Sequence, residues 1–290
     1  MRRTGTTILF DGFVRDPRFV TLYEPLNRIG EEPLLGGGSG VHQVDLYNDL
    51  RPIRDRFLRD HPHVSPLDLN YGGPTRATVE VDGETLPSDI EAYVAAVAAS
   101  PGPKVTKYVR LSTRIPLLHE VSPHGVLLWT LRDPRAVARS YLHGRNDQFA
   151  ERYHDAEDWF GRTSNFNRWS IGALSDAILA QTPALLDAPP TDLERVLIVW
   201  KHIVSSMARD APTSFGDRSL RLRHEDFCAA PTASMQAIFG LLGMDPSAEV
   251  CAWLEGTVVP AKAPRFVDDE RWDQVFDRLD MTALVAEQGY

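Results

Sequence analysis

The sequence predicts an α/β protein, in which a single domain is built on a central, mostly parallel sheet flanked by helices. Strand-like segments alternate with segments of helical spacing through most of the 290 residues. Residues 126–131 form a nearly continuous apolar run, which is typical of a strand buried in a parallel sheet. Neither a repeat nor a linker divides the chain, so we expect one domain over residues 1–290.

Apolar periodicity and breaker residues delimit the elements. Strands are expected at residues 19–23, 105–109, 126–131 and 219–223. Helices are expected at residues 7–14, 41–60, 90–99, 115–121, 193–208 and 233–242, and one more begins at Pro134. Proline ends several of them, because the residue before a proline avoids the helical region. Residues 30–100 contain an insertion, irregular over residues 61–87, that we expect to form part of an acceptor-site wall.

Composition excludes several classes of protein. The net charge of −9 argues against general nucleic-acid binding, which needs a basic face. Cys228 and Cys251 are too few and too isolated for a disulfide framework or a metal site. Nothing resembles a signal peptide, and no apolar run is long enough to span a membrane. We therefore expect a cytoplasmic enzyme with no membrane span.

The first residues have the composition of an anion-binding turn. Gly5 lies among Thr4, Thr6 and Thr7 at the start of the first expected helix, and Arg3 precedes them. Amide groups at a helix start, hydroxyl donors and a guanidinium together suit a phosphate-like anion. The alternative is that the hydroxyl residues are ordinary helix caps.

A second candidate anion site follows the strand at residues 126–131. Arg132 ends that strand, and Asp133 and Pro134 suit the cap and first turn of the next helix. Ligands of open α/β sheets bind beyond the carboxyl ends of the strands, so Arg132 is expected to face a ligand. Ser140 returns to the same helix face two turns later. The alternative is that Arg132 and Arg135 form surface ion pairs.

Taken together, these motifs resemble the sulfotransferases that use 3′-phosphoadenosine-5′-phosphosulfate (PAPS), most closely the carbohydrate branch. Residues 3–7 resemble the loop that binds the 5′-phosphosulfate, and residues 132–137 with Ser140 resemble the segment that binds the 3′-phosphate. Further similar segments are residues 22–26, 107–110, 222–227, 239–244 and 289–290. The resemblance implies a P-loop-like fold and transfer of a sulfuryl group to an acceptor hydroxyl. The family has a strand before the first loop, and this first strand is expected to be missing or truncated here.

The resemblance also implies roles for individual residues. Arg3 would stabilise the leaving phosphate, and Glu24, at a strand end, would be the general base, since burial beside Tyr23 and Pro25 could raise its pKa. His143 is the alternative base, although a histidine there is more often on the surface. A second reading makes Glu24 only an ion-pair partner of Arg3 or of Arg28.

Other candidates complete the expected site. Lys107 either steadies the sulfuryl group or is a solvated lysine, and Lys262 is expected to reach a nucleotide phosphate. Phe166 and Trp169 either stack on adenine or pack in the core. The chemistry needs no metal, and the His61 and His63 pair lacks further nearby ligands.

The acceptor is expected to be a hydroxyl of a sugar, a glycoside or another small molecule. Two alternative functions remain: a phosphoryl-transferring kinase, although the sequence has no Walker motif, and a non-catalytic nucleotide-binding protein.

Overall fold

A computed structural model describes residues 5–27, 47–66, 68–69, 80–81, 83, 85–144 and 147–290, except for the side chains of Trp169 and Ala184. The protein is of the mixed α/β type, and helices make up 57% of it, so most of its packing is between helices. Arg3, Thr4, Arg28 and much of the insertion at residues 30–100 lie outside the described residues.

The strands form two separate parallel pairs. β1 (Val20–Tyr23) pairs with β2 (Lys104–Lys107), and Tyr23 lies opposite Lys107. β3 (Leu127–Leu131) pairs with β4 (Ser219–Arg223), and Leu131 lies opposite Arg223. The parallel pairing was predicted correctly, but the expected single central sheet is not confirmed: among the described strands, ladder hydrogen bonds run only within each pair.

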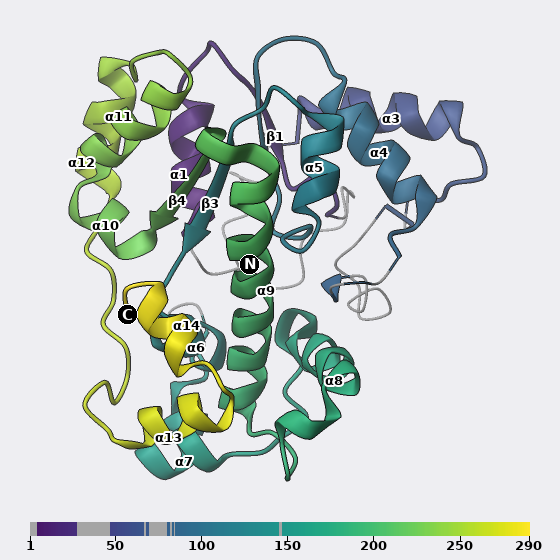
Figure 1. The fold of residues 1–290 in the computed structure, drawn as a ribbon. Coiled ribbons are helices and arrows are strands. Elements are labelled where there is room, and N and C mark those ends of the chain that lie inside the picture. The colour runs from purple at the N-terminus through teal and green to yellow at the C-terminus, as the bar shows by residue number, and fades with distance from the viewer. Residues whose placement is uncertain are drawn as a thin grey trace.

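Helices surround both pairs (Figure 1). They are α1 (Thr6–Val14), α3 (Leu50–Asp60), α4 (Ser88–Ala98), α5 (Ile115–Val121), α6 (Pro134–Leu142), α7 (Ala156–Gly161), α8 (Ile171–Gln181), α9 (Asp192–Phe215), α10 (His224–Ala229), α11 (Pro231–Leu241), α12 (Ala248–Thr257), α13 (Arg271–Arg278) and α14 (Thr282–Glu287). Short 3-10 turns include η3 (Ala150–Tyr153) and η4 (Arg168–Ser170).

The long helix α9 runs through the centre of the molecule (Figure 1). It begins at a capping box, in which the Thr191 hydroxyl accepts from the Glu194 amide and the Glu194 carboxylate accepts from the Thr191 amide. Its apolar face meets α5, α6 and α8, and the fully buried Trp200 donates its indole N–H to the carbonyl of Arg132 at 3.0 Å. The end of β3 is thereby fixed to the middle of α9.

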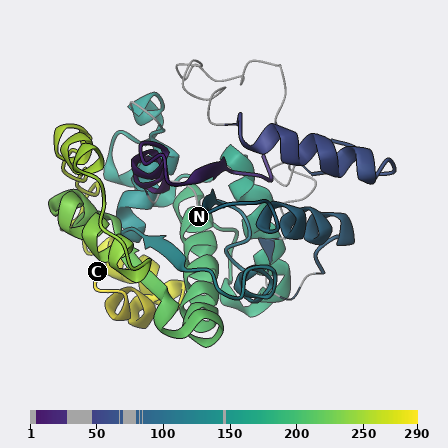
Figure 2. The same cartoon turned by 90° about the horizontal axis from the view of Figure 1, so that it is seen from above.

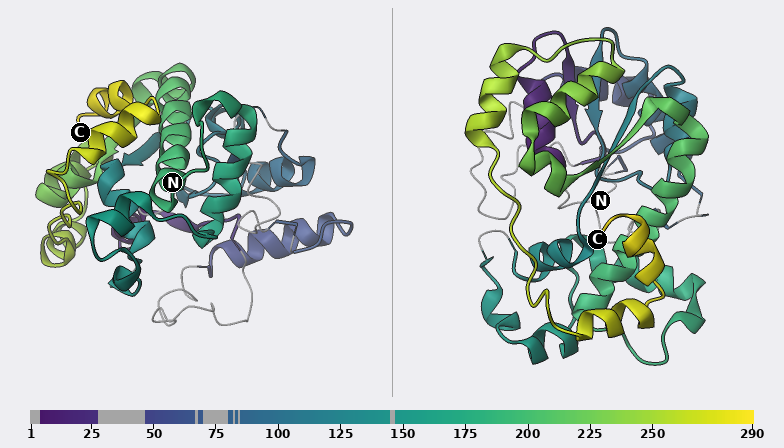
Figure 3. Two further views of the ribbon diagram at one scale, coloured as in Figure 1. Left: turned by 90° about the horizontal axis from the view of Figure 1, so that it is seen from below. Right: turned by 60° about the vertical axis from the view of Figure 1, so that its left-hand side comes forward.

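Three apolar clusters hold these elements. The largest surrounds α9, a second joins α3, α4 and β1, and a third joins α1 to α10, α11 and α12. Seen from above, α3 and α4 lie on one side of the strands, and α11 and α12 lie on the other (Figure 2). An extended segment, residues 258–270, runs from α12 to α13 along the outside of the molecule (Figure 3).

Candidate functional site

A charged or titratable residue stands at the carboxyl end of each strand. Glu24 directly follows β1 and Lys107 ends β2, whereas Arg132 follows β3 and His224 follows β4. Because parallel strands end at the same edge of a sheet, each pair presents two of these residues together. Residues from the two strand pairs can belong to one site only if another segment of the chain connects the pairs.

The turn at Gly5 makes that connection. Gly5 is the N-cap of α1 with a φ of 81°, a left-handed conformation that glycine adopts without strain, and a glycine has no side chain with which to cap the helix. On one side, the hydroxyl of Thr7 accepts a hydrogen bond from Nζ of Lys107 at 3.1 Å. On the other side, Gly5 lies against the imidazole of His224, where an added β-carbon would be 2.6 Å from Cε1. The first turn of α1 therefore touches the carboxyl ends of both strand pairs.

Glu24 and Lys107 form a buried ion pair. Nζ of Lys107 lies 2.8 Å from Oε1 of Glu24, and the two side chains are 5% and 9% exposed. The second carboxylate oxygen of Glu24 accepts a hydrogen bond from the amide of Asn27. The alternative of a solvated Lys107 is therefore wrong: the lysine ends its strand inside the protein, where Glu24 compensates its charge.

The ion pair lies against the ring of Tyr23, and the backbone of Glu24 is strained. Nζ of Lys107 lies 4.1 Å from the centre of the Tyr23 ring, a cation–π contact. Burial, and next the negative charge of Glu24, raise the pKa of the Tyr23 phenol, which stays neutral. Glu24 has a φ of 41°, in a region that side chains other than glycine adopt at a cost. Such strain is a common feature of functional sites.

Arg132 is a largely desolvated cation. Burial lowers the pKa of its guanidinium, while the charge of Glu225 has the opposite effect. Glu225 links three parts of the chain, since it accepts from the amide of Asp133 at 3.1 Å and from the hydroxyl of Tyr290 at 2.9 Å. Asp133 caps α6 as predicted, by accepting from the amide of Arg135 at 2.8 Å. The guanidinium of Arg135 also bonds to Asp133, so for Arg135 the ion-pair interpretation is correct.

His224 lies between the Gly5 turn and Arg132. Burial, and next the positive charge of Arg132, lower the pKa of its imidazole to about 4, so it is neutral at physiological pH. Its ring nitrogens also lie within hydrogen-bond reach of the Cys228 thiol, one turn further along α10. Gly5, His224 and Arg132 therefore form a continuous set of contacts and charges.

The other predicted residues lie around α6 and beyond it. Ser140 is half-buried in α6, the helix that Arg132 precedes. Lys262 is 64% exposed and lies 3.5 Å from Asp147, and Arg139 donates to the carbonyl of Ala263 at 2.8 Å. These contacts hold Lys262 near the last turn of α6, so the described structure does not bring it to Arg132. Phe166 is half-buried beside a separate pocket.

His143 is not the surface residue that was expected. It is the C-cap of α6 and 1% exposed, with Nε2 at 3.3 Å from the carbonyl of Tyr153. Burial lowers the pKa of its imidazole. It lies at the opposite end of α6 from Arg132, about 15 Å away along the helix axis. Glu24, in contrast, is linked to the Gly5 turn through Lys107 and Thr7.

Three contributors were missed in the sequence. Asn27 holds Glu24, His224 packs on Gly5, and Tyr290 holds Glu225. The position of His224 directly after the strand expected at residues 219–223 was the available signal, and α10 begins at His224. No sequence signal pairs Tyr290 with Glu225, because they are 65 residues apart.

Comparison with known proteins adds no family assignment. A scan against protein-family models gave no match, and a search of curated proteins also gave none. Among the described residues, none of the helices has the length and apolar character needed to cross a bilayer.

Proposed function

We propose that this protein transfers a sulfuryl group from PAPS to an acceptor hydroxyl, on a sugar, a glycoside or another small molecule. The proposal starts from the sequence resemblance and is supported most by one observation: the Gly5 turn contacts both Lys107, through Thr7, and His224, the neighbour of Arg132. One nucleotide with phosphates at its 5′ and 3′ positions needs two such anion-binding regions side by side.

The residues present suit a bisphosphorylated donor. The first turn of α1, whose N-cap is a glycine, offers amide groups to the 5′-phosphosulfate, with Thr6, Thr7 and the preceding Arg3 and Thr4 as further donors. Arg132, with Ser140, would hold the 3′-phosphate, and Lys262 would approach it after a movement of its segment. Since burial penalises the charge of Arg132, a phosphate placed beside that side chain would be strongly favoured.

Glu24 is the proposed general base. The bound nucleotide supplies the sulfuryl group, which leaves the 5′-phosphate oxygen as its bond to the acceptor oxygen forms. Glu24 takes the hydroxyl proton, which makes the acceptor a better nucleophile. Its carboxylate keeps lone pairs available beyond the bonds to Lys107 and Asn27. Lys107 and Arg3 would offset the negative charge that develops on the departing phosphate.

We also infer that the two strand pairs belong to the single sheet of a P-loop-like sulfotransferase fold. Both pairs are parallel, and functional side chains follow the same end of each strand. This arrangement is what an interrupted parallel sheet would give.

Calorimetric titration tests the nucleotide site. We expect adenosine 3′,5′-bisphosphate to bind tightly and ATP to bind much more weakly, because the site has no Walker lysine. Arg132→Ala should weaken binding of the bisphosphate by more than about tenfold. Arg135→Ala, in the first turn of the helix that follows Arg132, is the matched control, since its guanidinium is engaged by Asp133. Equal affinity for ATP, or an unchanged dissociation constant in Arg132→Ala, would contradict the proposed site.

A second experiment separates an enzyme from a nucleotide-binding protein. Radiolabelled PAPS is incubated with a panel of hydroxylated sugars, glycosides and small alcohols, and transfer of label is measured. Labelled product that disappears in Glu24→Gln supports the proposal. Tight binding without transfer to any acceptor class would favour the non-catalytic alternative.

A further inference from the structure

A cavity lined by arginines and aromatic residues lies near the last turn of α6. Its volume is about 380 Å³, and its walls come from the end of α6, from η3 and from the segment between α7 and η4. Three arginines, Arg152, Arg162 and Arg168, and three aromatic residues, Phe149, Tyr153 and Phe166, line it, and none of the lining residues is acidic. In a protein with a net charge of −9, such a concentration of arginines needs an explanation.

Arg152 and Arg168 both make cation–π contacts with the ring of Phe149. The guanidinium carbon of Arg168 lies 4.0 Å from the centre of the Phe149 ring, and that of Arg152 lies 5.2 Å from it. Burial lowers the pKa of Arg168, and the positive charge of Arg152 lowers it further. The fold thus holds two like charges together at the rim of the cavity, at an electrostatic cost that a bound anion would remove.

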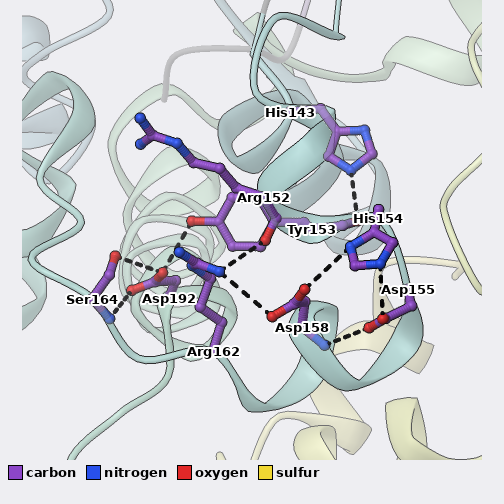
Figure 4. A network of polar contacts seen from close by, with 9 residues as sticks. All are labelled: His143, Arg152, Tyr153, His154, Asp155, Asp158, Arg162, Ser164 and Asp192. Carbon is purple, nitrogen blue, oxygen red and sulfur yellow. Dashed lines mark hydrogen bonds and ion pairs between the residues drawn. The ribbon is translucent and has the colours of Figure 1, made fainter.

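The nearby carboxylates do not neutralise Arg152. Asp158 is occupied by Arg162 at 3.5 Å and by His154 at 3.2 Å. The buried Asp192 accepts from Tyr153 and Ser164. In Figure 4 the guanidinium of Arg152 extends away from both carboxylates, and among the described residues no carboxylate lies within ion-pair distance of it. Arg152 is therefore available to a ligand.

We propose that this cavity binds an organic anion, namely a phosphate, sulfate or carboxylate group carried on a ring. Guanidinium groups form paired hydrogen bonds with such oxyanions, and the walls formed by Phe149, Tyr153 and Phe166 offer apolar contact to the ring. The volume is in the range of small-molecule sites. The cavity is separated from Arg132 by the length of α6, so this site is independent of the proposed nucleotide site and does not rest on it.

Calorimetry with phenyl phosphate, phenol and inorganic phosphate tests whether the cavity recognises both the anionic group and the ring that carries it. We expect phenyl phosphate to bind at least about tenfold more tightly than either of the others. Phenyl sulfate and benzoate, as further arms, identify the preferred anion. Arg152→Gln should weaken binding of phenyl phosphate at least about tenfold, and Phe149→Leu should reduce its affinity toward that of inorganic phosphate.

The controls separate this site from others. Arg209→Gln removes an exposed arginine of α9 that is paired with Asp210, and should leave binding unchanged. Arg152 is exposed, so its replacement should keep the melting temperature. No saturable binding of phenyl phosphate would overturn the proposal. Equally, loss of binding in Arg132→Ala but not in Arg152→Gln would place the ligand at the nucleotide site and overturn it.

Discussion

Gly5 and His224 are in direct contact, so that a β-carbon on Gly5 would overlap the imidazole. The contact joins the start of α1 to the end of β4 and leaves no room for a side chain between the two. It also explains why glycine is needed at this position on two grounds, the left-handed backbone and the approach of the ring.

Gly5→Ala should destabilise the protein by roughly 2–4 kcal/mol, through a strained backbone and through overpacking against His224. Gly243→Ala is the matched control, because Gly243 has a φ of 66° but nothing within 4 Å of an added β-carbon. It should cost only about 1 kcal/mol. Urea unfolding of both variants measures the difference, and equal losses would show that the His224 contact carries no energy.

Replacing Lys107 should lower the free energy of unfolding, because the charge of Glu24 is buried. Lys107→Met removes the cation that pairs with the buried carboxylate in the described structure, and we expect a loss of about 3–5 kcal/mol. Combining it with Glu24→Gln should recover part of that loss, with a coupling energy of about 1–3 kcal/mol. A double-mutant cycle by denaturant unfolding gives this value. Simple additivity of the two variants would mean that the ion pair does not stabilise the fold.

Glu24→Gln should strongly reduce the proposed sulfuryl transfer but keep the proposed nucleotide site. The amide preserves the shape of the side chain but cannot accept the hydroxyl proton, so kcat should fall by about 10²–10⁴-fold. The dissociation constant of adenosine 3′,5′-bisphosphate should change little, because Glu24 is linked to the Gly5 turn indirectly, through Lys107 and Thr7. Near-normal turnover in this variant would move the base role to another residue.

Stability should decline as the pH falls from about 6.5 toward 4. In the unfolded chain His224 takes up a proton near its ordinary pKa of 6.5, whereas in the folded protein its pKa is about 4. Acid therefore favours the unfolded state over this window, and the full shift corresponds to roughly 3 kcal/mol. Burial lowers the pKa of His143 as well, which adds to the same trend.

His224→Gln should flatten this pH dependence of the free energy of unfolding, as measured by urea titration at pH 7, 6 and 5. His63→Gln is the control, because 67% of the His63 side chain is exposed. If the free energy of unfolding of His224→Gln depends on pH as steeply as that of the unsubstituted protein, the fold does not lower the pKa of His224.

Local signals predicted most elements well. The helix at residues 115–121 and the strand at residues 219–223 have the predicted bounds, and Asp133 caps α6 as its position before Pro134 indicated. The helix expected at residues 193–208 extends from Asp192 to Phe215. Periodicity and capping are properties of neighbouring residues, so they can be read without knowledge of the fold.

Features that depend on distant residues could not be predicted. The burial of Lys107 depends on Glu24, 83 residues earlier, and the burial of His143 depends on the packing of η3 and α7 over the end of α6. The arginine-lined cavity is built from short 3-10 turns and irregular segments, which have no periodic pattern. The division of the strands into two pairs is likewise decided by tertiary packing rather than by any one strand.

That division has a consequence for how the candidate site is held together. Among the described strands no ladder hydrogen bond joins the two pairs, so side chains rather than backbone bonds connect them. Val105 of β2 packs on the same apolar cluster as Leu128 of β3 and Leu220 of β4, and α1 contributes to that cluster. The relative position of Lys107 and Arg132 therefore depends on side-chain packing around α1.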